Sequence, residues 1–490
     1  PGADSIRLVV RDVVVDGSRV IGAADMAPLW QDMLGRDVTL SAVYDLADRL
    51  TALYRNKGYV LSAVTVPQQT IQGGVVRLTA IEGYVGSVDF DAGVQPTARM
   101  RAEAAALAAE RPLTARTLER QMLLLNELAG ITAQAYFEPG SQTGEAKLTI
   151  KAVRRAVSGS VGVQNRVSRL LGDVAIEARV TVNNVLGWDE SHSLLLQTTN
   201  RARLRSVGYA YNQPLGSDGL AMNLFLGHVE SRIDSSGTPL RSASDIVTLG
   251  LSYPLIRSRA ETLRLRARLN VYNGTQDFRE FQFVQEDRAR ALRVGASWDR
   301  TDAAGVSFAD VELSKGISGL GATRPAVDTA QRTNADYGFT KFTYFLGRLQ
   351  HLGGDFSLQA SVQGQWTRDP LPPSERAALG GELILRAFTA GELIGDRAQA
   401  AKLELRYEPS LIPGGRVSFY GFVEAGRTRT LETLVADTVQ KGVSTGLGAR
   451  GSLAGGLNFY LEAAQQHRRS NVVSTSHRRS RVFAGLSYEF

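Results

Sequence analysis

The chain of 490 residues contains no cysteine, and this absence removes several kinds of chemistry at once. Disulfide bonds, thiolate metal sites and cysteine nucleophiles all need a residue that the sequence lacks. Histidine is scarce, and its five residues lie far apart, without the helical spacing of a metal-binding pair. We therefore expect no metal site and no cofactor.

Familiar catalytic motifs are missing as well. The sequence shows no P-loop, no dinucleotide-binding fingerprint and no nucleophile elbow. These absences favour a protein that is not an enzyme. One alternative stays open, because a membrane-barrel hydrolase can assemble its site from residues scattered over several strands.

Long apolar runs are also absent. No stretch of 18 or more apolar residues occurs, which excludes a conventional transmembrane helix. A membrane barrel remains possible, because each of its strands needs only alternate residues that face lipid. The chain opens at Pro1 without a charged and apolar leader, so we expect that any signal peptide was removed or left out.

The first third of the chain predicts two αβ modules of one plan, over residues 5–83 and 84–155. Each module should have a strand, a helical region and two further strands. In the first module we expect a strand from Ile6 to Val15 and a helix that begins at Thr39 and ends at Gly58. In the second we expect a helix that is capped by Thr114 and ends at Gly130.

Residues 156–490 predict a closed, all-β transmembrane barrel of about 16 antiparallel strands. Apolar and polar residues alternate in segments of nine to twelve residues that are separated by turn residues. The segment at 356–367 alternates throughout, and the segment at 263–272 places Arg264, Arg266 and Arg268 on one face. Without interleaved aromatic residues we interpret these arginines as lumenal, and expect no nucleic acid as a partner.

The last strand alternates up to a terminal aromatic residue. Val482, Ala484, Leu486, Tyr488 and Phe490 share one face. The pattern resembles the insertion signal of outer-membrane barrels. We expect Tyr488 and Phe490 to lie in the aromatic belt where lipid meets water.

Short strings in the N-terminal modules resemble POTRA domains, the polypeptide-transport-associated modules of outer-membrane transporters. The strings are Tyr54 to Tyr59, Val66 to Gln69 with Gly73-Gly74, and Glu82-Gly83, followed in the second module by Leu118 to Arg120 and Leu123 to Asn126 with Gly130. Two such modules before a barrel resemble the two-partner secretion transporters, called TpsB proteins, of the ShlB, FhaC and HecB kind.

A local motif supports this resemblance. Leu385, Arg386, Ala387 and Phe388, followed by Gly391 and Gly395-Asp396, resemble a hairpin loop that this superfamily folds into the barrel lumen with an Arg at its tip. Ala387 stands where the family pattern has Gly, which would change the backbone of the tip. The resemblance implies an acidic partner on the barrel wall, and the candidate is Glu424, with Gly426 in the same string.

The resemblance implies an outer-membrane protein with periplasmic POTRA domains that capture an unfolded exoprotein and a barrel that forms its conduit. The partners would be a secreted adhesin or cytolysin, outer-membrane lipid and the barrel assembly machinery. The alternative is an assembly or insertion factor of the same superfamily, although two modules rather than more argue against it. We expect the Arg386 and Glu424 pair to lie in a wet lumen, where it would position the loop but add little stability.

Overall fold

The computed structural model describes residues 3–235, 238–325, 329–432, 436–470 and 479–490. The chain divides into two compact units near residue 154. Among the described residues, no helix combines the length and the apolar character that a membrane span requires.

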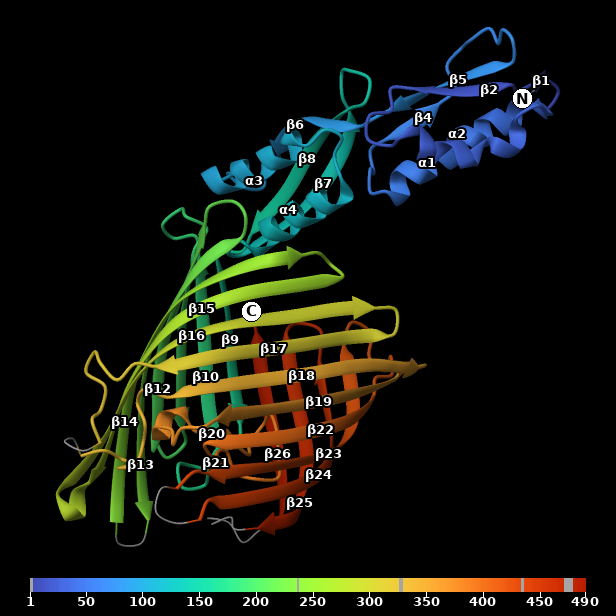
Figure 1. Cartoon of the computed structure of the whole chain (residues 1–490). Helices are drawn as coiled ribbons and strands as arrows, with labels where there is room; N and C mark the ends of the chain where they lie inside the picture. Colours follow the sequence, from blue (N-terminus) through green and yellow to red (C-terminus); the bar gives the residue numbers. More distant parts are fainter. Residues whose placement is uncertain (1–2, 236–237, 326–328, 433–435, 471–478) are drawn as a thin grey trace. The chain divides into compact units, whose positions relative to one another are not determined.

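The first module is a small sheet packed on helices (Figure 1). Its sheet has the order β2-β5-β4, and a separate two-stranded sheet pairs β1 with β3. The single strand that we expected from Ile6 to Val15 is therefore wrong, because β1 and β2 belong to different sheets. The elements are β1 (Arg7–Val9), β2 (Asp12–Asp16), α1 (Ala23–Met26), η1 (Ala27–Leu29), η2 (Gln31–Met33), β3 (Asp37–Thr39), α2 (Leu40–Asn56), β4 (Ala63–Thr65) and β5 (Val75–Ile81).

Helix α2 forms where the sequence predicts it. The Thr39 hydroxyl accepts a hydrogen bond from the backbone N–H of Ala42, so it caps the first turn. Gly58 follows the helix with φ +93°, a conformation that glycine adopts without strain. Leu46, Leu50 and Tyr54 are fully buried against the sheet.

The second module repeats this plan with a three-stranded sheet of order β6-β8-β7. Thr114 caps α4 by accepting a hydrogen bond from the backbone N–H of Thr117. Leu107, Leu125 and Leu148 are completely buried between helices and sheet. The elements are β6 (Tyr84–Phe90), α3 (Ala98–Ala109), α4 (Ala115–Glu127), β7 (Ile131–Pro139) and β8 (Glu145–Arg154).

In the second unit, 16 strands of the described residues form one closed antiparallel barrel, as the alternation predicts (Figure 1). Consecutive barrel strands are hydrogen-bonded neighbours, and β26 closes the ring on β9. The strands are β9 (Val157–Gln164), β10 (Ala175–Asn183), β11 (Ser191–Thr199), β12 (Leu204–Leu215), β13 (Leu220–Ser235), β14 (Thr238–Arg257), β15 (Glu261–Phe278), β16 (Phe283–Asp302), β17 (Gly305–Gly316), β18 (Thr340–Gly353), β19 (Phe356–Thr367), β22 (Arg397–Tyr407), β23 (Arg416–Thr430), β24 (Thr438–Ser452), β25 (Leu457–Ser470) and β26 (Ser480–Glu489).

Strand lengths match the expectation in part of the barrel only. β19 covers Phe356–Thr367, the segment that alternates in the sequence. β14 and β16 have 20 residues each, well beyond the expected nine to twelve. Since about 9–11 residues cross a bilayer, these strands continue past it.

Arg266 and Arg268, two of the three lumenal arginines of β15, are paired with carboxylates. Arg266 lies 2.6 Å from a carboxylate oxygen of Asp310 and 3.3 Å from one of Glu312, both on β17. Arg268 also pairs with Glu312. This wall therefore carries ion pairs rather than bare positive charge.

Candidate functional site

The candidate site lies in the long connection between β19 and β22. This connection, residues 368–396, contains η4 (Pro373–Glu375) and a hairpin of β20 (Ala377–Leu379) and β21 (Leu393–Gly395). The tip of the hairpin carries Leu385, Arg386, Ala387 and Phe388, all of which are buried. A side chain on a surface loop would be solvated, so the burial places this tip inside the barrel.

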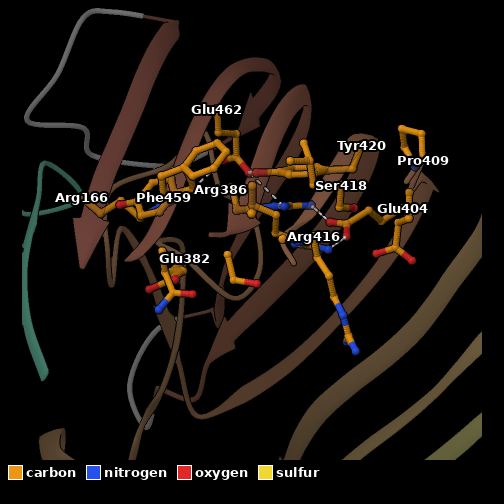
Figure 2. A pocket seen from close by; sticks show the side chains of 18 of the residues that line it. Arg166, Glu382, Arg386, Glu404, Pro409, Arg416, Ser418, Tyr420, Phe459 and Glu462 are labelled. Carbon is orange, nitrogen blue, oxygen red and sulfur yellow. Dashed lines mark hydrogen bonds and ion pairs between the residues drawn. The ribbon is translucent and has the colours of Figure 1, made fainter. Parts of the chain in front are cut away.

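Arg386 contacts three glutamates from three barrel strands. Its Nε lies 2.8 Å from Glu424 on β23, its Nη2 lies 2.8 Å from Glu404 on β22, and its Nη1 lies 2.9 Å from Glu462 on β25. The backbone N–H of Arg386 also donates to Glu424, at 2.7 Å. Figure 2 shows the guanidinium group pointing toward Glu404 and Glu462. We call these three glutamates the socket.

Aromatic rings complete the surroundings of the guanidinium group. The ring centre of Phe422 lies 3.5 Å from the Arg386 Cζ atom, and the ring centre of Tyr420 lies 5.6 Å from it. A cation over an aromatic face is attracted by the quadrupole of the ring. The rings also limit the access of water to the socket.

The expectation of a wet pair is wrong. Arg386 is 4% exposed, and the three socket glutamates are at most 1% exposed. Removal of one partner from a buried ion pair leaves an uncompensated charge, which costs about 3–5 kcal/mol. The tip is therefore held far more strongly than a solvated pair would hold it.

The backbone of the tip differs from the expectation for Ala387. The residue with positive φ is Leu385, at +54°, and Ala387 has no such conformation. The Ala387 methyl group packs among Tyr420, Phe422 and Phe483, and its carbonyl accepts a hydrogen bond from Gln466 at 2.9 Å. Alanine therefore fits at the tip without backbone strain.

Two glycines of the barrel wall make room for the hairpin. A Cβ atom on Gly426 would lie 3.0 Å from a methyl carbon of Leu379 and 3.1 Å from one of Leu385. A Cβ atom on Gly442 would lie 2.8 Å from the ring of Phe388. The side chains of the loop thus occupy the space that larger wall residues would fill.

The base of the loop is fixed by a second set of buried charges. Asp396 accepts hydrogen bonds from Arg332 at 2.6 Å and from the backbone N–H of Leu371 at 2.8 Å. Glu375 lies 2.7 Å from both Arg293 and Lys341 on the barrel wall. Gly380, Gly381 and Gly391 all have positive φ between this base and the tip.

A cavity of about 860 Å³ borders the tip, and its lining contains both signs of charge. Arg386, Glu404 and Glu462 form part of its wall, together with Arg166 and Arg416 (Figure 2). Arg450 also lines the cavity. In the part of the chain that the structure describes, no group of histidine, aspartate and glutamate residues could hold a metal ion. The cavity is therefore a space lined by charged and polar side chains.

The terminal aromatic residues lie on the outside of the barrel. Tyr488 is 46% exposed and Phe490 is 52% exposed, and their rings stack with centres 6.2 Å apart. The backbone N–H of Phe490 donates to the carbonyl of Gly159 at 3.0 Å, and the N–H of Gly159 donates back. The end of the chain therefore takes part in closing the barrel.

Sequence reasoning missed Glu404 and Glu462. Each stands at an inward position between apolar outward residues: Leu403 and Leu405 flank Glu404, and Leu461 precedes Glu462. The alternation could have marked both as lumenal. It could not show that β22, β23 and β25 bring their carboxylates to one point, because this depends on the curvature and stagger of the closed barrel.

The fold and the loop define a class of protein: an outer-membrane β-barrel that is preceded by POTRA-type modules and carries a loop folded back onto its inner wall. The family model of the haemolysin secretion/activation proteins ShlB/FhaC/HecB matches residues 144–451, and that of the ShlB-type POTRA domain matches residues 8–83. The chain belongs to this family. It is an outer-membrane transporter of two-partner secretion, the class that moves partner exoproteins across the membrane.

Known proteins are similar over most of the chain. The heme/hemopexin transporter protein HuxB of Haemophilus influenzae is 23% identical over 90% of this chain and 80% of its own length. The outer membrane transporter CdiB of Dickeya dadantii is 22% identical over 85% and 75% of the two chains, and the hemolysin transporter protein ShlB of Serratia marcescens is 22% identical over 79% and 70%.

Solved structures show the same fold. The structure of CdiB from Escherichia coli matches with a TM-score of 0.78 at 19% identity, over 100% of this chain and 92% of that one. BamA from Haemophilus ducreyi, lacking POTRA domains 1–3, matches with a TM-score of 0.58 at 13% identity, over 99% and 100%. The transporter reading is favoured over the assembly-factor alternative, because the named relatives are secretion transporters.

Proposed function

We propose that the loop tip around Arg386 is a latch that closes the lumen and must leave the socket before an exoprotein can pass. The observation that supports this most directly is the contact of one loop arginine with carboxylates of three barrel strands. Because one side chain makes all three contacts, withdrawal of the tip would break them together.

The charges at the base of the loop and the glycines between base and tip indicate which part of the loop moves. The base is held through Glu375 and Asp396, whereas Gly380, Gly381 and Gly391 separate it from the tip. Glycines with positive φ can absorb a change in backbone direction with little steric cost. The tip can therefore swing while the base stays attached.

The proposed domains are residues 5–83 and 84–155 for the two POTRA modules and 156–490 for the barrel. The POTRA modules capture the unfolded exoprotein by adding an extended segment to a sheet edge, where β2, β4, β6 and β7 are the edge strands. Outer-membrane lipid surrounds the exposed apolar side chains of the barrel, and the barrel assembly machinery inserts it. The chain carries out transport without catalysing a reaction.

The names of the relatives suggest the type of cargo. ShlB is named a hemolysin transporter and HuxB a heme/hemopexin transporter, so the relatives differ in what they carry. For this chain we propose a large secreted protein of the adhesin or cytolysin type.

A locked tip tests the latch. Because the chain has no cysteine, Ala387→Cys with Gln466→Cys provides a single crosslinkable pair, at a position where the Gln466 side chain bonds the Ala387 carbonyl. Crosslinking should stop secretion of the exoprotein, and a reductant should restore it. The matched control is Ala463→Cys with Val482→Cys, which joins paired residues of β25 and β26 without the loop. Secretion that continues at full rate with the tip locked would refute the latch.

A further inference from the structure

The three socket glutamates differ in the partners that each would retain if Arg386 withdrew. Glu404 also bonds Arg406 at 2.8 Å and Arg450 at 2.9 Å. Glu462 also bonds Arg166 at 2.9 Å and accepts a hydrogen bond from Tyr420. Besides its bonds with Arg386, Glu424 accepts a hydrogen bond from the neutral hydroxyl of Ser444, at 3.0 Å.

We propose that Arg166, Arg406 and Arg450 are resident cations of the socket, which neutralise Glu404 and Glu462 when the loop tip withdraws and thereby make the released state accessible. This inference rests on the proposed role of the tip as a latch. It assigns these three arginines to the positioning of wall carboxylates rather than to contact with the cargo.

The socket glutamates are buried, which makes their charges costly when they are unpaired. A carboxylate that is nearly inaccessible to water costs several kcal/mol if it stays ionised without a partner. With Arg386 as the sole cation, the socket would hold the tip too firmly to release it. The resident arginines reduce the negative potential, and they also repel the incoming Arg386, so both effects weaken the hold on the tip.

Arg166 connects the socket to the place where the barrel closes. Its guanidinium group lies 4.5 Å from the ring centre of Phe483 on β26 and 5.0 Å from that of Tyr460 on β25, and its side chain is 8% exposed. The preceding residue, Asn165, extends the pairing of β9 with β26: its side-chain oxygen accepts from the N–H of Ala484 at 2.8 Å, and its amide donates to the carbonyl of Val482 at 3.2 Å.

This pairing of β9 with β26 comprises five residue pairs, from Gly485 with Gln164 to Glu489 with Ser160. Adjacent β10 pairs with β9 over eight residues and with β11 over nine. Arg166 therefore anchors Glu462 to a short closing seam. Because the anchor lies on the wall and on the first barrel connection, it stays in place while the tip moves.

The guanidinium group of Arg166 has further N–H donors besides the one that bonds Glu462. Arg166 bonds Glu462 through Nη2, and its buried Nε and Nη1 atoms are not engaged with that carboxylate in the seated state. These donors can turn to Glu462 when Arg386 withdraws, so that one arginine takes over both oxygens of the carboxylate. A guanidinium group is suited to this exchange, because its planar fork matches a carboxylate.

The test uses the full chain in planar bilayers, where ion conductance reports the release of the tip. Arg166→Gln and Arg450→Gln should each lower the open probability by at least about tenfold. A unit charge lost at ion-pair distance, where the effective dielectric constant is about 20, corresponds to roughly a thousandfold before water and salt in the lumen screen it. Arg386→Gln should raise the open probability, because it removes the side chain that the socket holds. The matched control is Arg266→Gln, which removes a lumenal, carboxylate-paired arginine from β15 outside the socket.

A compensating variant separates electrostatics from loss of structure. Arg166→Gln with Glu462→Gln removes the charge together with its partner, so the open probability should rise above that of Arg166→Gln alone. A purely structural role predicts that the double variant is at least as impaired as the single one. Heat-modified mobility on gels checks that each barrel is folded.

The outcomes distinguish this inference from the latch itself. If the locked tip blocks secretion but Arg166→Gln and Arg450→Gln leave the open probability unchanged or raise it, the resident-cation proposal is wrong and the latch stands. If the locked tip leaves secretion intact, both fall. A decrease equal to that of Arg266→Gln would also overturn the proposal, because it would show a general effect of lumenal charge.

Discussion

At the scale of single residues, Arg386 combines a main-chain and a side-chain hold on Glu424. The Arg386 N–H donates to one carboxylate oxygen and its Nε to the other. A substitution at position 386 removes the side-chain bonds and leaves only the backbone bond to Glu424. The planar guanidinium group of arginine bonds all three carboxylates, a geometry that the ammonium group of lysine does not reproduce.

Arg386→Ala should release the tip without unfolding the barrel. The change leaves Glu424 without its arginine and removes one of the cations that bond Glu404 and Glu462, so we expect the seated state to lose about 3–5 kcal/mol. A loss of that size favours the released state by more than about a hundredfold, since every 1.4 kcal/mol is a factor of ten. Conductance in planar bilayers should rise, and the heat-modified mobility of the barrel should stay unchanged. Equal conductance of the two proteins would contradict the seated tip.

Arg386→Lys is the informative companion of that variant. Lysine keeps the positive charge but loses the fork geometry, so it can satisfy fewer of the three carboxylates. We expect its conductance to lie between those of the intact protein and Arg386→Ala. Conductance as low as that of the intact protein would show that charge alone holds the tip.

In the first POTRA module, Tyr54 links the helix to the end of the sheet. Its hydroxyl donates to the Ser18 hydroxyl at 2.7 Å and lies 3.2 Å from the Glu82 carboxylate, which also accepts from the backbone N–H groups of Arg19 and Val20. Burial raises the pKa of Tyr54 to about 12. This contact gives a physical role to Glu82, which stands in one of the strings that resemble POTRA domains.

This pKa predicts how the module responds to alkali. The folded pKa lies above the ordinary value of 10, so the stabilisation is fully present below pH 10 and is lost as the pH rises through about 12. Tyr54→Phe should remove this dependence and lower the stability at neutral pH by about 1 kcal/mol, through lost hydrogen bonds. Urea unfolding followed at pH 8 and at pH 11 measures both effects. Parallel pH curves for the two proteins would contradict the assignment.

At the scale of elements, the wall strand β23 shows a difference between its two faces. Gly426 faces the loop, and a Cβ atom there would press on Leu379 and Leu385, whereas a Cβ atom on Gly421 would meet nothing closer than a carbonyl oxygen at 3.9 Å. Both glycines lie in the same strand, so they share its backbone geometry. They differ in the face on which they lie, and only Gly426 lies against the side chains of the loop.

Gly426→Val should therefore unseat the hairpin. Valine is favoured in strands, so the barrel should still form, but its methyl groups occupy the space of the loop side chains. We expect higher conductance for Gly426→Val and unchanged conductance for Gly421→Val, measured in bilayers at equal amounts of folded protein. Equal effects of the two substitutions would show that the loop does not depend on this space.

The sequence predicts barrel strands well where one face of the strand meets lipid and the other faces the lumen. β19 agrees with its predicted bounds because every second residue faces lipid and must be apolar. The long strands β14 and β16 continue beyond the bilayer, where both faces meet water and the alternation carries no constraint. The strand Ile6 to Val15 failed for a related reason, because a run of apolar residues does not reveal a change of sheet in its middle.

For the loop, the sequence motif located the tip, but the expected surroundings were wrong: a solvated lumen was expected, and Arg386 is buried. The resemblance placed Arg386 near Glu424, and the structure brings them together at 2.8 Å. The other two glutamates and the resident arginines come from strands that are distant in sequence. Their meeting depends on barrel closure, which short-range patterns do not encode.

At the scale of the whole molecule, Phe490 extends the pairing that closes the barrel. The backbone of Phe490 exchanges two hydrogen bonds with Gly159, next to the five-pair seam of β26 with β9. These bonds involve main-chain atoms only, so they do not require an aromatic side chain. The ring of Phe490 is half exposed and stacks on Tyr488, and we propose that it is recognised during insertion.

Phe490→Ala separates these two roles. If the ring is read by the assembly machinery, the amount of folded barrel in the outer membrane should fall several-fold, whereas the barrels that do insert should melt at the same temperature as the intact protein, because the main-chain bonds remain. The control is Phe419→Ala, which removes an aromatic ring of similar exposure, 42%, from β23. Unchanged barrel amounts with a lower melting temperature would instead assign the ring of Phe490 to the stability of the seam.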